Sequence, residues 1–170
     1  MDPAVRHAAG GLRAAIQAEL EGEHFYLMAA QTTTDRKGKQ IFAQLAAEER
    51  DHQRLLRAQL ESVLQTGAAA ASIVAGAAPS LDESSPIFSE KIRARLAEAH
   101  FEMTALSVGI QLELAAERHY RQAAEDISDE ALKRLYTQLA DWEAGHYAAL
   151  LRQQEDLKED YWHAAGFAPF

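Results

Sequence analysis

The chain has 170 residues, of which 48% are apolar and 25% charged, and it contains only four prolines and nine glycines. This composition disfavours disordered, collagen-like and turn-rich all-β proteins, and the length fits one domain covering residues 1–170. The net charge of −9 argues against nucleic acid as a partner. Because there is no cysteine, disulfides, zinc fingers and iron–sulfur clusters are excluded, and any metal must be bound by histidine and carboxylate. No stretch is apolar over the roughly 20 residues that span a bilayer, so we expect no membrane partner and a soluble, cytoplasmic protein.

The first part of the chain predicts a helix hairpin at about residues 5–65. Residues of core type recur there at steps of three and four, which is the period of one helix face. A threonine-rich stretch and the turn-forming segment 35–38 interrupt the pattern, so two helices joined by a short turn are predicted. The first stripe consists of Leu12, Ile16, Glu19, Glu23, Tyr26 and Ala30. The second consists of Phe42, Leu45, Glu49, His52, Leu56 and Val63.

Residues 66–100 are predicted to form a crossover connection, because Gly67 opens a segment whose glycine, serine and proline interrupt a long helix. A short helix is expected within 87–99. A second hairpin follows at about 101–158, with Ser128 as the predicted N-cap of its second helix. Its stripes consist of Leu106, Ile110, Glu113, Glu117, Tyr120 and Ala124, and of Tyr136, Leu139, Glu143, His146 and Leu150. The tail, 159–170, is expected to pack Trp162 and Phe167 over one end of the bundle.

The two hairpins are related by an internal duplication. Residues 12–60 align with 106–154 at a constant shift of 94, with 18 identities in 49 positions that include the glutamates, tyrosines and histidines of the stripes. Two antiparallel hairpins and one long connection predict an all-α four-helix bundle with one crossover. Exchange of a hairpin between two chains is a low-cost route to association, so a homodimer or larger homo-oligomer is expected.

Four glutamates and two histidines occupy stripe positions where the helical period calls for apolar residues. A carboxylate buried alone is too costly, so these glutamates must be neutralised, paired or bound to metal. Glu49 with His52, and Glu143 with His146, each place a carboxylate and an imidazole on one helix face. Two Glu-x-x-His pairs and two single glutamates are the ligand set of di-iron and di-manganese carboxylate bundles. The predicted ligands are Glu19, Glu49, His52, Glu113, Glu143 and His146.

The sequence resembles the ferritin-like superfamily and, within it, the rubrerythrin group. The resemblance rests on the segments ELEGEHFYLMAA, LAAEERDH, ELAAERHYRQAA and LADWEAGH, and it covers the chain from Leu12 to about Gln153. It implies two metal ions bridged by Glu49 and Glu143, with Glu19 and Glu113 terminal or chelating and with His52 and His146 binding one ion each. The chain departs from this group in having no cysteine-rich rubredoxin domain and in having Ala116 where these proteins carry an additional glutamate.

Other polar residues near the stripes receive simpler interpretations. The hydroxyls of Tyr26 and Tyr120 are expected to hydrogen-bond ligand carboxylates rather than to act in redox chemistry. Glu23 and Glu117 are either bundle-edge charges paired with arginine or histidine, or residues that guide or ligate ions. Glu48 and the adjacent Glu125 and Asp126 are interpreted as solvated charge. Surface or rim positions are expected for His7, His24, His100, His119 and His163.

The function hypothesis is a di-iron oxidoreductase of ferroxidase or peroxidase type. Two Fe(II) ions would reduce O2 or H2O2, each giving one electron, and an external electron donor would restore them. Oxygen and nitrogen ligands do not distinguish iron from manganese, so a Mn or mixed Fe/Mn centre and a manganese catalase are alternatives. An iron-binding or storage protein without turnover, and a structural bundle whose site has lost function, are the competing classes. Whether the protein is an enzyme is therefore left open by the sequence.

Overall fold

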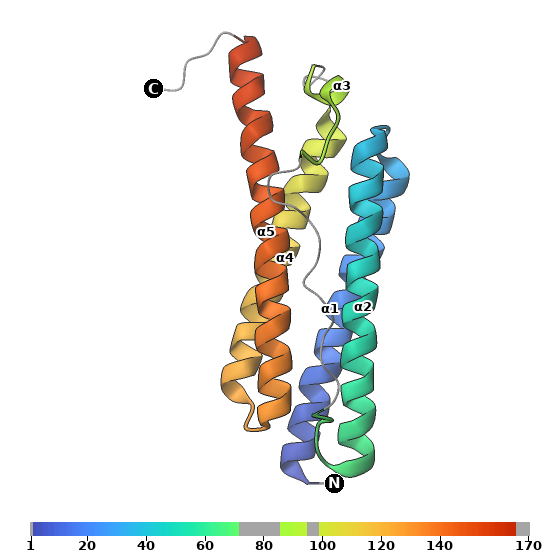
Figure 1. Ribbon diagram of the computed structural model, residues 1–170, viewed down its shortest axis with the longest axis vertical. Helices are drawn as coiled ribbons and strands as arrows, with labels where there is room; N and C mark the ends of the chain where they lie inside the picture. Colours follow the sequence, from blue (N-terminus) through green and yellow to red (C-terminus); the bar gives the residue numbers. More distant parts are fainter. Residues whose placement is uncertain (1, 72–85, 95–98, 166–170) are drawn as a thin grey trace.

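The structure is a computed structural model that describes residues 2–71, 86–94 and 99–165 (Figure 1). Within these ranges every regular element is a helix. The helices are α1 (Pro3–Thr32), α2 (Arg36–Thr66), the single-turn α3 (Glu90–Arg93), α4 (His100–Asp126) and α5 (Glu130–Ala165). The predicted all-α class is confirmed. None of these helices is long and apolar enough to cross a bilayer.

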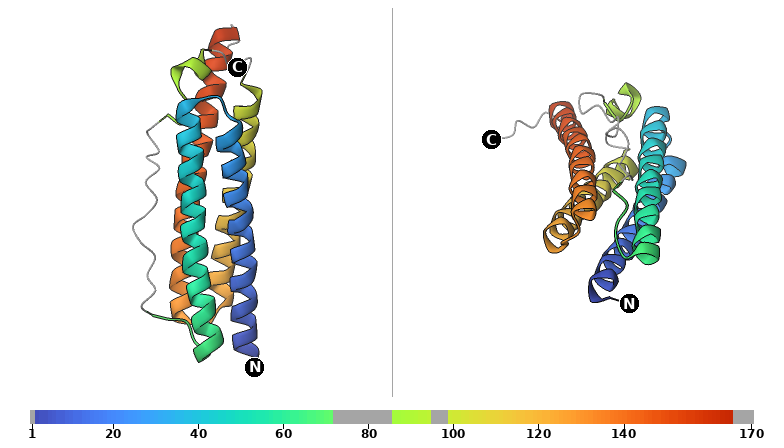
Figure 2. Two further views of the ribbon diagram at one scale, coloured as in Figure 1. Left: turned by 90° about the vertical axis from the view of Figure 1, so that its right-hand side faces the viewer. Right: turned by 60° about the horizontal axis from the view of Figure 1, so that its bottom comes forward.

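The four long helices form two hairpins, as the duplication predicts. α1 packs along α2, and α4 packs along α5. Figure 1 shows that α2 and α4 run in the same direction, which requires the long connection between Thr66 and His100. The second view in Figure 2 shows the two hairpins lying side by side around a common interior. The short helix expected within 87–99 is α3.

The last helix is longer than the sequence pattern suggests. α5 continues to Ala165 and so includes residues 159–165 of the predicted tail. The proposed packing of Trp162 and Phe167 lies outside the described residues, because neither side chain is among them.

In each hairpin, an aspartate side chain caps the N-terminus of the second helix. Asp35 accepts a hydrogen bond from the Gly38 N–H at 2.8 Å and begins α2. Asp129 accepts from the N–H groups of Ala131 at 2.8 Å and Leu132 at 3.1 Å, at the start of α5. The prediction of Ser128 as this N-cap is therefore wrong by one residue. The physical reason is that the Asp129 carboxylate reaches two free N–H groups of the first turn.

The same two aspartates also bind the crossover. The Asp35 carboxylate accepts hydrogen bonds from Ser89, and the Asp129 carboxylate accepts one from the Ala69 N–H at 3.2 Å. Two buried glutamines act in the same way. Gln59 exchanges two 2.9 Å hydrogen bonds with the backbone of Ala70, and Gln153 accepts from the Ile87 N–H. Each pair, 35 with 129 and 59 with 153, is an identity of the duplication, so the repeat positions hold both ends of the crossover.

Helix α2 ends at a left-handed glycine. Gly67 has φ +81°, and its N–H donates to the Val63 carbonyl at 3.0 Å. Glycine adopts this conformation without the steric cost that a Cβ would add, and it is the commonest way to end a helix. The crossover therefore begins at Gly67, as the sequence predicts.

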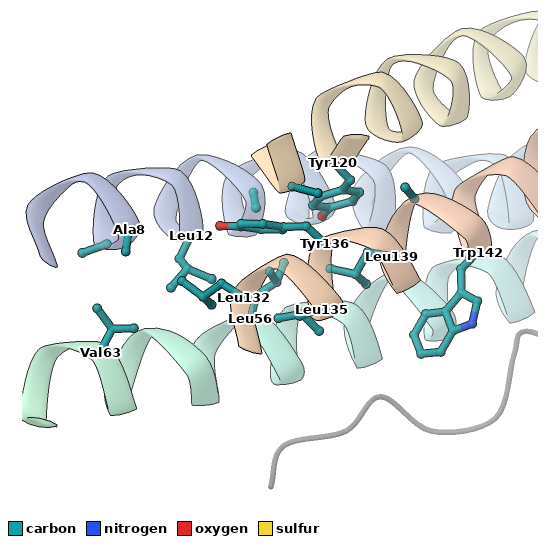
Figure 3. Packing of buried hydrophobic residues seen from close by; sticks show 14 residues of the cluster. Ala8, Leu12, Leu56, Val63, Tyr120, Leu132, Leu135, Tyr136, Leu139 and Trp142 are labelled. Atoms are coloured by element: carbon teal, nitrogen blue, oxygen red, sulfur yellow. The ribbon is translucent and has the colours of Figure 1, made fainter. Parts of the chain in front are cut away.

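Two apolar clusters occupy the two halves of the bundle interior. One lies toward the turn between α4 and α5 and is shown in Figure 3. Its large buried members include Leu12, Leu56, Tyr120, Leu132, Tyr136, Leu139 and Trp142. The other lies toward the turn between α1 and α2 and includes Tyr26, Phe42, Ile87, Phe88, Leu106 and Leu150. Burying a side chain of this size stabilises the fold by about 1.5–3 kcal/mol, and the two clusters leave a polar layer between them.

The cap at Asp129 has a measurable stability effect. Burial raises the pKa of Asp129, but hydrogen bonds from the backbone of Leu132, Ala69 and Ala131 outweigh it and lower the pKa below the usual value. We expect Asp129→Ala to reduce the free energy of unfolding by about 1–2 kcal/mol at neutral pH. Because the stabilisation needs the ionised carboxylate, the difference from wild type should shrink as the pH falls through that lowered pKa.

Denaturant unfolding followed by circular dichroism checks this expectation. Glu125→Ala, which removes an exposed charge near the same turn, is the control and should change stability by less than about 0.5 kcal/mol. A neutral-pH loss for Asp129→Ala no larger than that of the control would contradict the assignment of Asp129 as the N-cap.

Candidate metal centre

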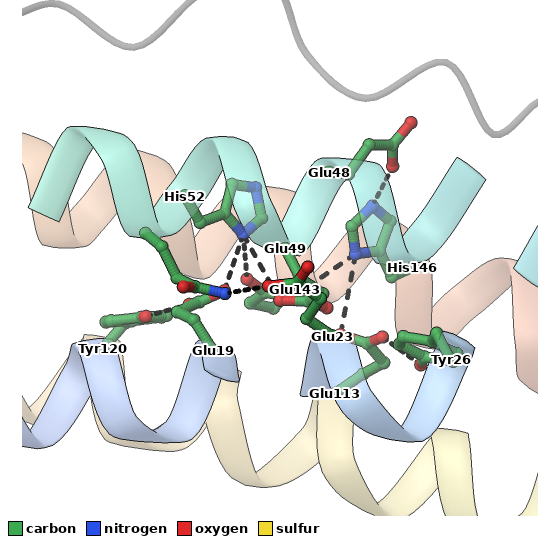
Figure 4. Close-up of polar contacts among 11 residues, drawn as sticks. Glu19, Glu23, Tyr26, Glu48, Glu49, His52, Glu113, Tyr120, Glu143 and His146 are labelled. Carbon is green, nitrogen blue, oxygen red and sulfur yellow. Dashed lines mark hydrogen bonds and ion pairs between the residues drawn. The ribbon is translucent and has the colours of Figure 1, made fainter. Parts of the chain in front are cut away.

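Each long helix contributes one glutamate to the polar layer between the apolar clusters. Glu19 lies on α1, Glu49 on α2, Glu113 on α4 and Glu143 on α5, and none is more than 4% exposed. His52 and His146 lie one turn after the glutamates of α2 and α5 and are 2% and 1% exposed. Figure 4 shows all six side chains converging at one level of the bundle. The structure therefore brings together every residue that the sequence predicts as a ligand.

The six side chains form two overlapping groups. In each group the ligand atoms lie within 4.8 Å of one another. The first group is Glu19, Glu49, His52 and Glu143, and the second is Glu49, Glu113, Glu143 and His146. Each group offers three carboxylates and one imidazole, and Glu49 and Glu143 belong to both.

Several carboxylate oxygens converge on a single nitrogen of each histidine. The His52 Nδ1 atom lies 3.1 Å from Glu19, 3.0 Å from Glu143 and 3.7 Å from Glu49. The His146 Nδ1 atom lies 3.3 Å from Glu143 and 3.6 Å from Glu113. One ring nitrogen carries at most one proton, so it can donate to only one of these oxygens.

A buried oxygen of Glu143 is left without a hydrogen bond. Its Oε1 atom is close to His52 but is not in hydrogen-bonding geometry with any described group. Acceptor oxygens thus outnumber donors in the layer. A pair of divalent cations would satisfy all of them at once, and carboxylate with imidazole suits iron, manganese and zinc alike. The residues present therefore fit a two-metal centre.

The electrostatics of the layer favour retained protons when no cation is bound. Burial raises the pKa of Glu49 well above the ordinary value, and the nearby charges of Glu19 and Glu143 raise it further. Burial and Glu143 raise the pKa of Glu113 to about 8. Burial also favours the neutral form of Glu143, but the adjacent His52 and His146 outweigh it and hold its pKa well below the usual range.

The pKa values of both histidines are shifted upward, which is opposite to the effect of burial alone. Burial lowers the pKa of each imidazole, but the surrounding carboxylates outweigh it. The pKa of His52 is raised well above the ordinary value, mainly by Glu143, and that of His146 mainly by Glu113 and Glu143. Protons on the imidazoles and on part of the carboxylates thus take the place of cations. A metal ion must displace them to bind.

Two tyrosines hold the unshared glutamates from across the bundle. The hydroxyl of Tyr26 on α1 donates to Glu113 on α4, and the hydroxyl of Tyr120 on α4 donates to Glu19 on α1. Burial raises the pKa of both phenols well above the usual value, and the neighbouring glutamates raise it further. The hydroxyls therefore stay protonated and act as hydrogen-bond donors, in the arrangement that the sequence interpretation expects.

Glu48 is part of the layer, contrary to its interpretation as solvated charge. Its Oε2 atom lies 2.7 Å from His146 Nε2, and its side chain is 17% exposed. The bond fixes the His146 ring so that Nδ1 faces the glutamates. Glu48 precedes His52 by four residues and so lies near the same face of α2, but this spacing gives no signal for a contact with His146 on α5. The corresponding residue of the second half, Trp142, stacks on His52 with ring centroids 5.2 Å apart.

Glu23 and Glu117 are paired with arginine and take no part in either group. Glu23 accepts hydrogen bonds from Arg50 at 2.5 and 2.8 Å and from Gln53 at 2.7 Å, and Glu117 accepts one from Arg121 at 3.0 Å. Of the two readings offered by the sequence, the structure supports bundle-edge charge. The expected surface positions are confirmed for four histidines, His7, His24, His100 and His119, while the side chain of His163 lies outside the described residues.

A cavity of about 310 Å³ reaches the glutamates from the side where α1 faces α4. It touches Glu19, Glu49 and Glu113, and its walls include the small residues Ala18, Gly22, Ala115 and Ala116. A Cβ at residue 22 would lie 3.3 Å from the Glu49 carboxyl carbon, so Gly22 lets this carboxylate approach α1 without a shift. Ala116 lines this space with a side chain of a single methyl group.

Comparison with known proteins agrees with the geometry. The family model for Rubrerythrin matches residues 11–152, a range that includes all six clustered glutamates and histidines and both tyrosines. Comparisons with curated proteins and with solved structures give no match. Because the family model covers most of the chain, the protein belongs to the Rubrerythrin family.

Proposed function

We propose that the protein is a di-iron carboxylate oxidoreductase that reduces H2O2 or O2, in the manner of a peroxidase or ferroxidase. The observation that carries the proposal is the pair of buried ligand groups that share Glu49 and Glu143. Membership of the Rubrerythrin family supports the same class of centre. All six side chains come from one chain, so the centre needs no residue from a partner.

The grouping suggests a role for each ligand. Glu49 and Glu143 belong to both groups and would bridge the two ions. Glu19 with His52, and Glu113 with His146, belong to one group each and would complete the two positions. Four carboxylates offset the charge of two divalent ions, which removes the electrostatic cost of burying them together.

The bound ions would supply one electron each to the oxidant, so that one H2O2 with two protons yields two molecules of water. The chain's own residues prepare the site for this reaction. The cavity between α1 and α4 admits a small oxidant to the glutamates. Tyr26 and Tyr120 fix the unshared carboxylates, and the apolar clusters exclude water along the bundle axis. A reductant must then return two electrons for each turnover.

Peroxide consumption by the metal-loaded protein distinguishes this function from its alternatives. We expect the iron-loaded protein to consume H2O2 only as fast as an added electron donor is oxidised, and to release no O2. A manganese catalase would evolve one O2 for every two H2O2 without a donor. An iron-binding protein without turnover would stop after one reaction per centre, and either result would contradict the proposal.

Substitution of the ligands tests the proposed roles. Glu49→Ala and Glu143→Ala each remove a ligand from both ions and should abolish binding of the pair, whereas Glu19→Ala and Glu113→Ala should weaken mainly one ion. Glu117→Ala, at a residue paired with Arg121, is the control and should retain two ions. Elemental analysis after Fe(II) or Mn(II) reconstitution and desalting measures the stoichiometry. About one ion or fewer per wild-type chain, or loss of metal only in the control, would contradict the ligand assignment.

Metal binding should release protons near neutral pH. The raised pKa values of Glu49, Glu113, His52 and His146 mean that these groups hold protons in the metal-free protein. Because ligands must be deprotonated, metal affinity should fall as the pH is lowered from about 8 to 6. Calorimetric titration in buffers of different ionisation enthalpy measures the number released. A binding heat independent of the buffer would show that no proton is displaced, against this expectation.

A further inference from the structure

We infer that the two metal positions are inequivalent and that the position at His146 fills first, because Glu48 holds His146 through its outer nitrogen whereas the equivalent residue, Trp142, offers His52 no acceptor. The inference rests on the proposed two-metal function and adds to it an order of loading and the residue that sets it. Glu48 acts here as a positioning residue, through His146.

The groups that would touch the ions do not by themselves distinguish the two positions. Each position has three carboxylates and one imidazole, and two of the carboxylates are common to both. The unshared glutamates are also matched, since Tyr120 donates to Glu19 and Tyr26 donates to Glu113. The clearest difference between the two positions in residue type therefore lies outside the two groups.

The internal duplication is broken at the residue that precedes each shared glutamate. Residues 48 and 142 are equivalent at the shift of 94, and each contacts the histidine of the opposite hairpin. The Glu48 Oε2 atom lies 2.7 Å from His146 Nε2, and Figure 4 marks this contact with a dashed line. The indole of Trp142 lies over His52 with centroids 5.2 Å apart and planes inclined by 20°. Among the described residues His52 Nε2 has no hydrogen-bond partner.

The hydrogen bond to Glu48 should strengthen metal binding at His146. A metal-bound imidazole whose other N–H donates to a carboxylate is held in one tautomer and orientation and becomes a more basic ligand. Loss of such a bond typically reduces metal affinity by about 10- to 100-fold. Stacking by Trp142 orients the His52 ring. The indole offers no acceptor to the outer N–H of His52, because the indole nitrogen is only a donor. The His146 position should therefore bind its ion about 10- to 100-fold more tightly.

The order of loading has a consequence for the reaction. With one equivalent of metal, the protein would hold a single ion at His146, and both shared glutamates would be engaged by it alone. The second ion at His52 would then complete the pair. Two-electron reduction of the oxidant would begin only at this second step.

Titration of the metal-free full-length protein with Co(II) tests the order directly. Proton NMR of the paramagnetic protein resolves the ring N–H signals of Co(II)-bound histidines, which His52→Asn and His146→Asn assign. At one equivalent we expect the His146 signal alone, in slow exchange with water because Glu48 accepts that proton. The His52 signal should appear with the second equivalent and exchange faster.

Variants at the two equivalent positions provide the controls. Glu48→Ala should lower the affinity of the first step by about 10- to 100-fold, so that the two positions fill together. Glu48→Gln, which keeps an oxygen acceptor, should restore part of the difference. Trp142→Phe keeps an aromatic ring without adding an acceptor. Glu61→Ala removes an exposed charge from α2, the helix that carries Glu48. Both variants should retain ordered loading. Far-UV circular dichroism verifies that each variant is folded.

The outcomes separate this inference from the function on which it rests. Equal occupancy of the two positions at one equivalent in the wild-type protein, or ordered loading that persists in Glu48→Ala, would overturn the inference while leaving the two-metal centre intact. Occupancy of the His52 position first would also overturn it. Failure to bind Co(II), Fe(II) or Mn(II) at the six residues would overturn both.

Discussion

The burial of four glutamates at one level of the bundle is the constraint on which the other features depend. Carboxylates taken out of water are stable only when protons, donors or cations compensate their charge. Two imidazoles and two phenolic hydroxyls point at these carboxylates, and the pKa values of Glu49 and Glu113 are raised so that protons supply the remainder. The apolar clusters above and below make this compensation necessary, because they keep solvent from entering along the bundle axis.

Duplication explains how so short a chain builds a centre with two similar halves. Equivalent residues bind across the bundle rather than within their own hairpin: Tyr26 reaches Glu113, and Tyr120 reaches Glu19. The duplication also accounts for contacts outside the centre: equivalent aspartates cap helices, and equivalent glutamines hydrogen-bond the two ends of the crossover. Positions where the repeats differ then identify chemistry specific to one half. Residues 48 and 142 are the clearest case, since one is a carboxylate and the other an indole.

Much of the fold and the ligand cluster could be predicted from the sequence, because both leave a periodic signal. A glutamate in a core stripe is unusual by itself, and its recurrence at 94 residues' distance cannot be attributed to an alanine-rich composition. The role of Glu48 was missed because its partner, His146, lies on a different helix. Helical periodicity describes one helix face, whereas the angle at which two hairpins meet is set by tertiary packing. The cap at Asp129 was missed for a different reason: Ser128 and Asp129 are both good N-caps, and the alignment of Asp129 with Asp35 was the signal that separates them.

Anomalous X-ray diffraction from crystals of the iron-loaded protein would show directly whether two ions lie in the polar layer of the bundle. We expect two iron peaks inside the bundle, about 3.5–4 Å apart, with Glu49 and Glu143 contacting both. Glu19 and His52 should flank one peak, and Glu113 and His146 the other. A single peak, or iron bound only at surface carboxylates such as Glu125 and Asp126, would contradict this expectation.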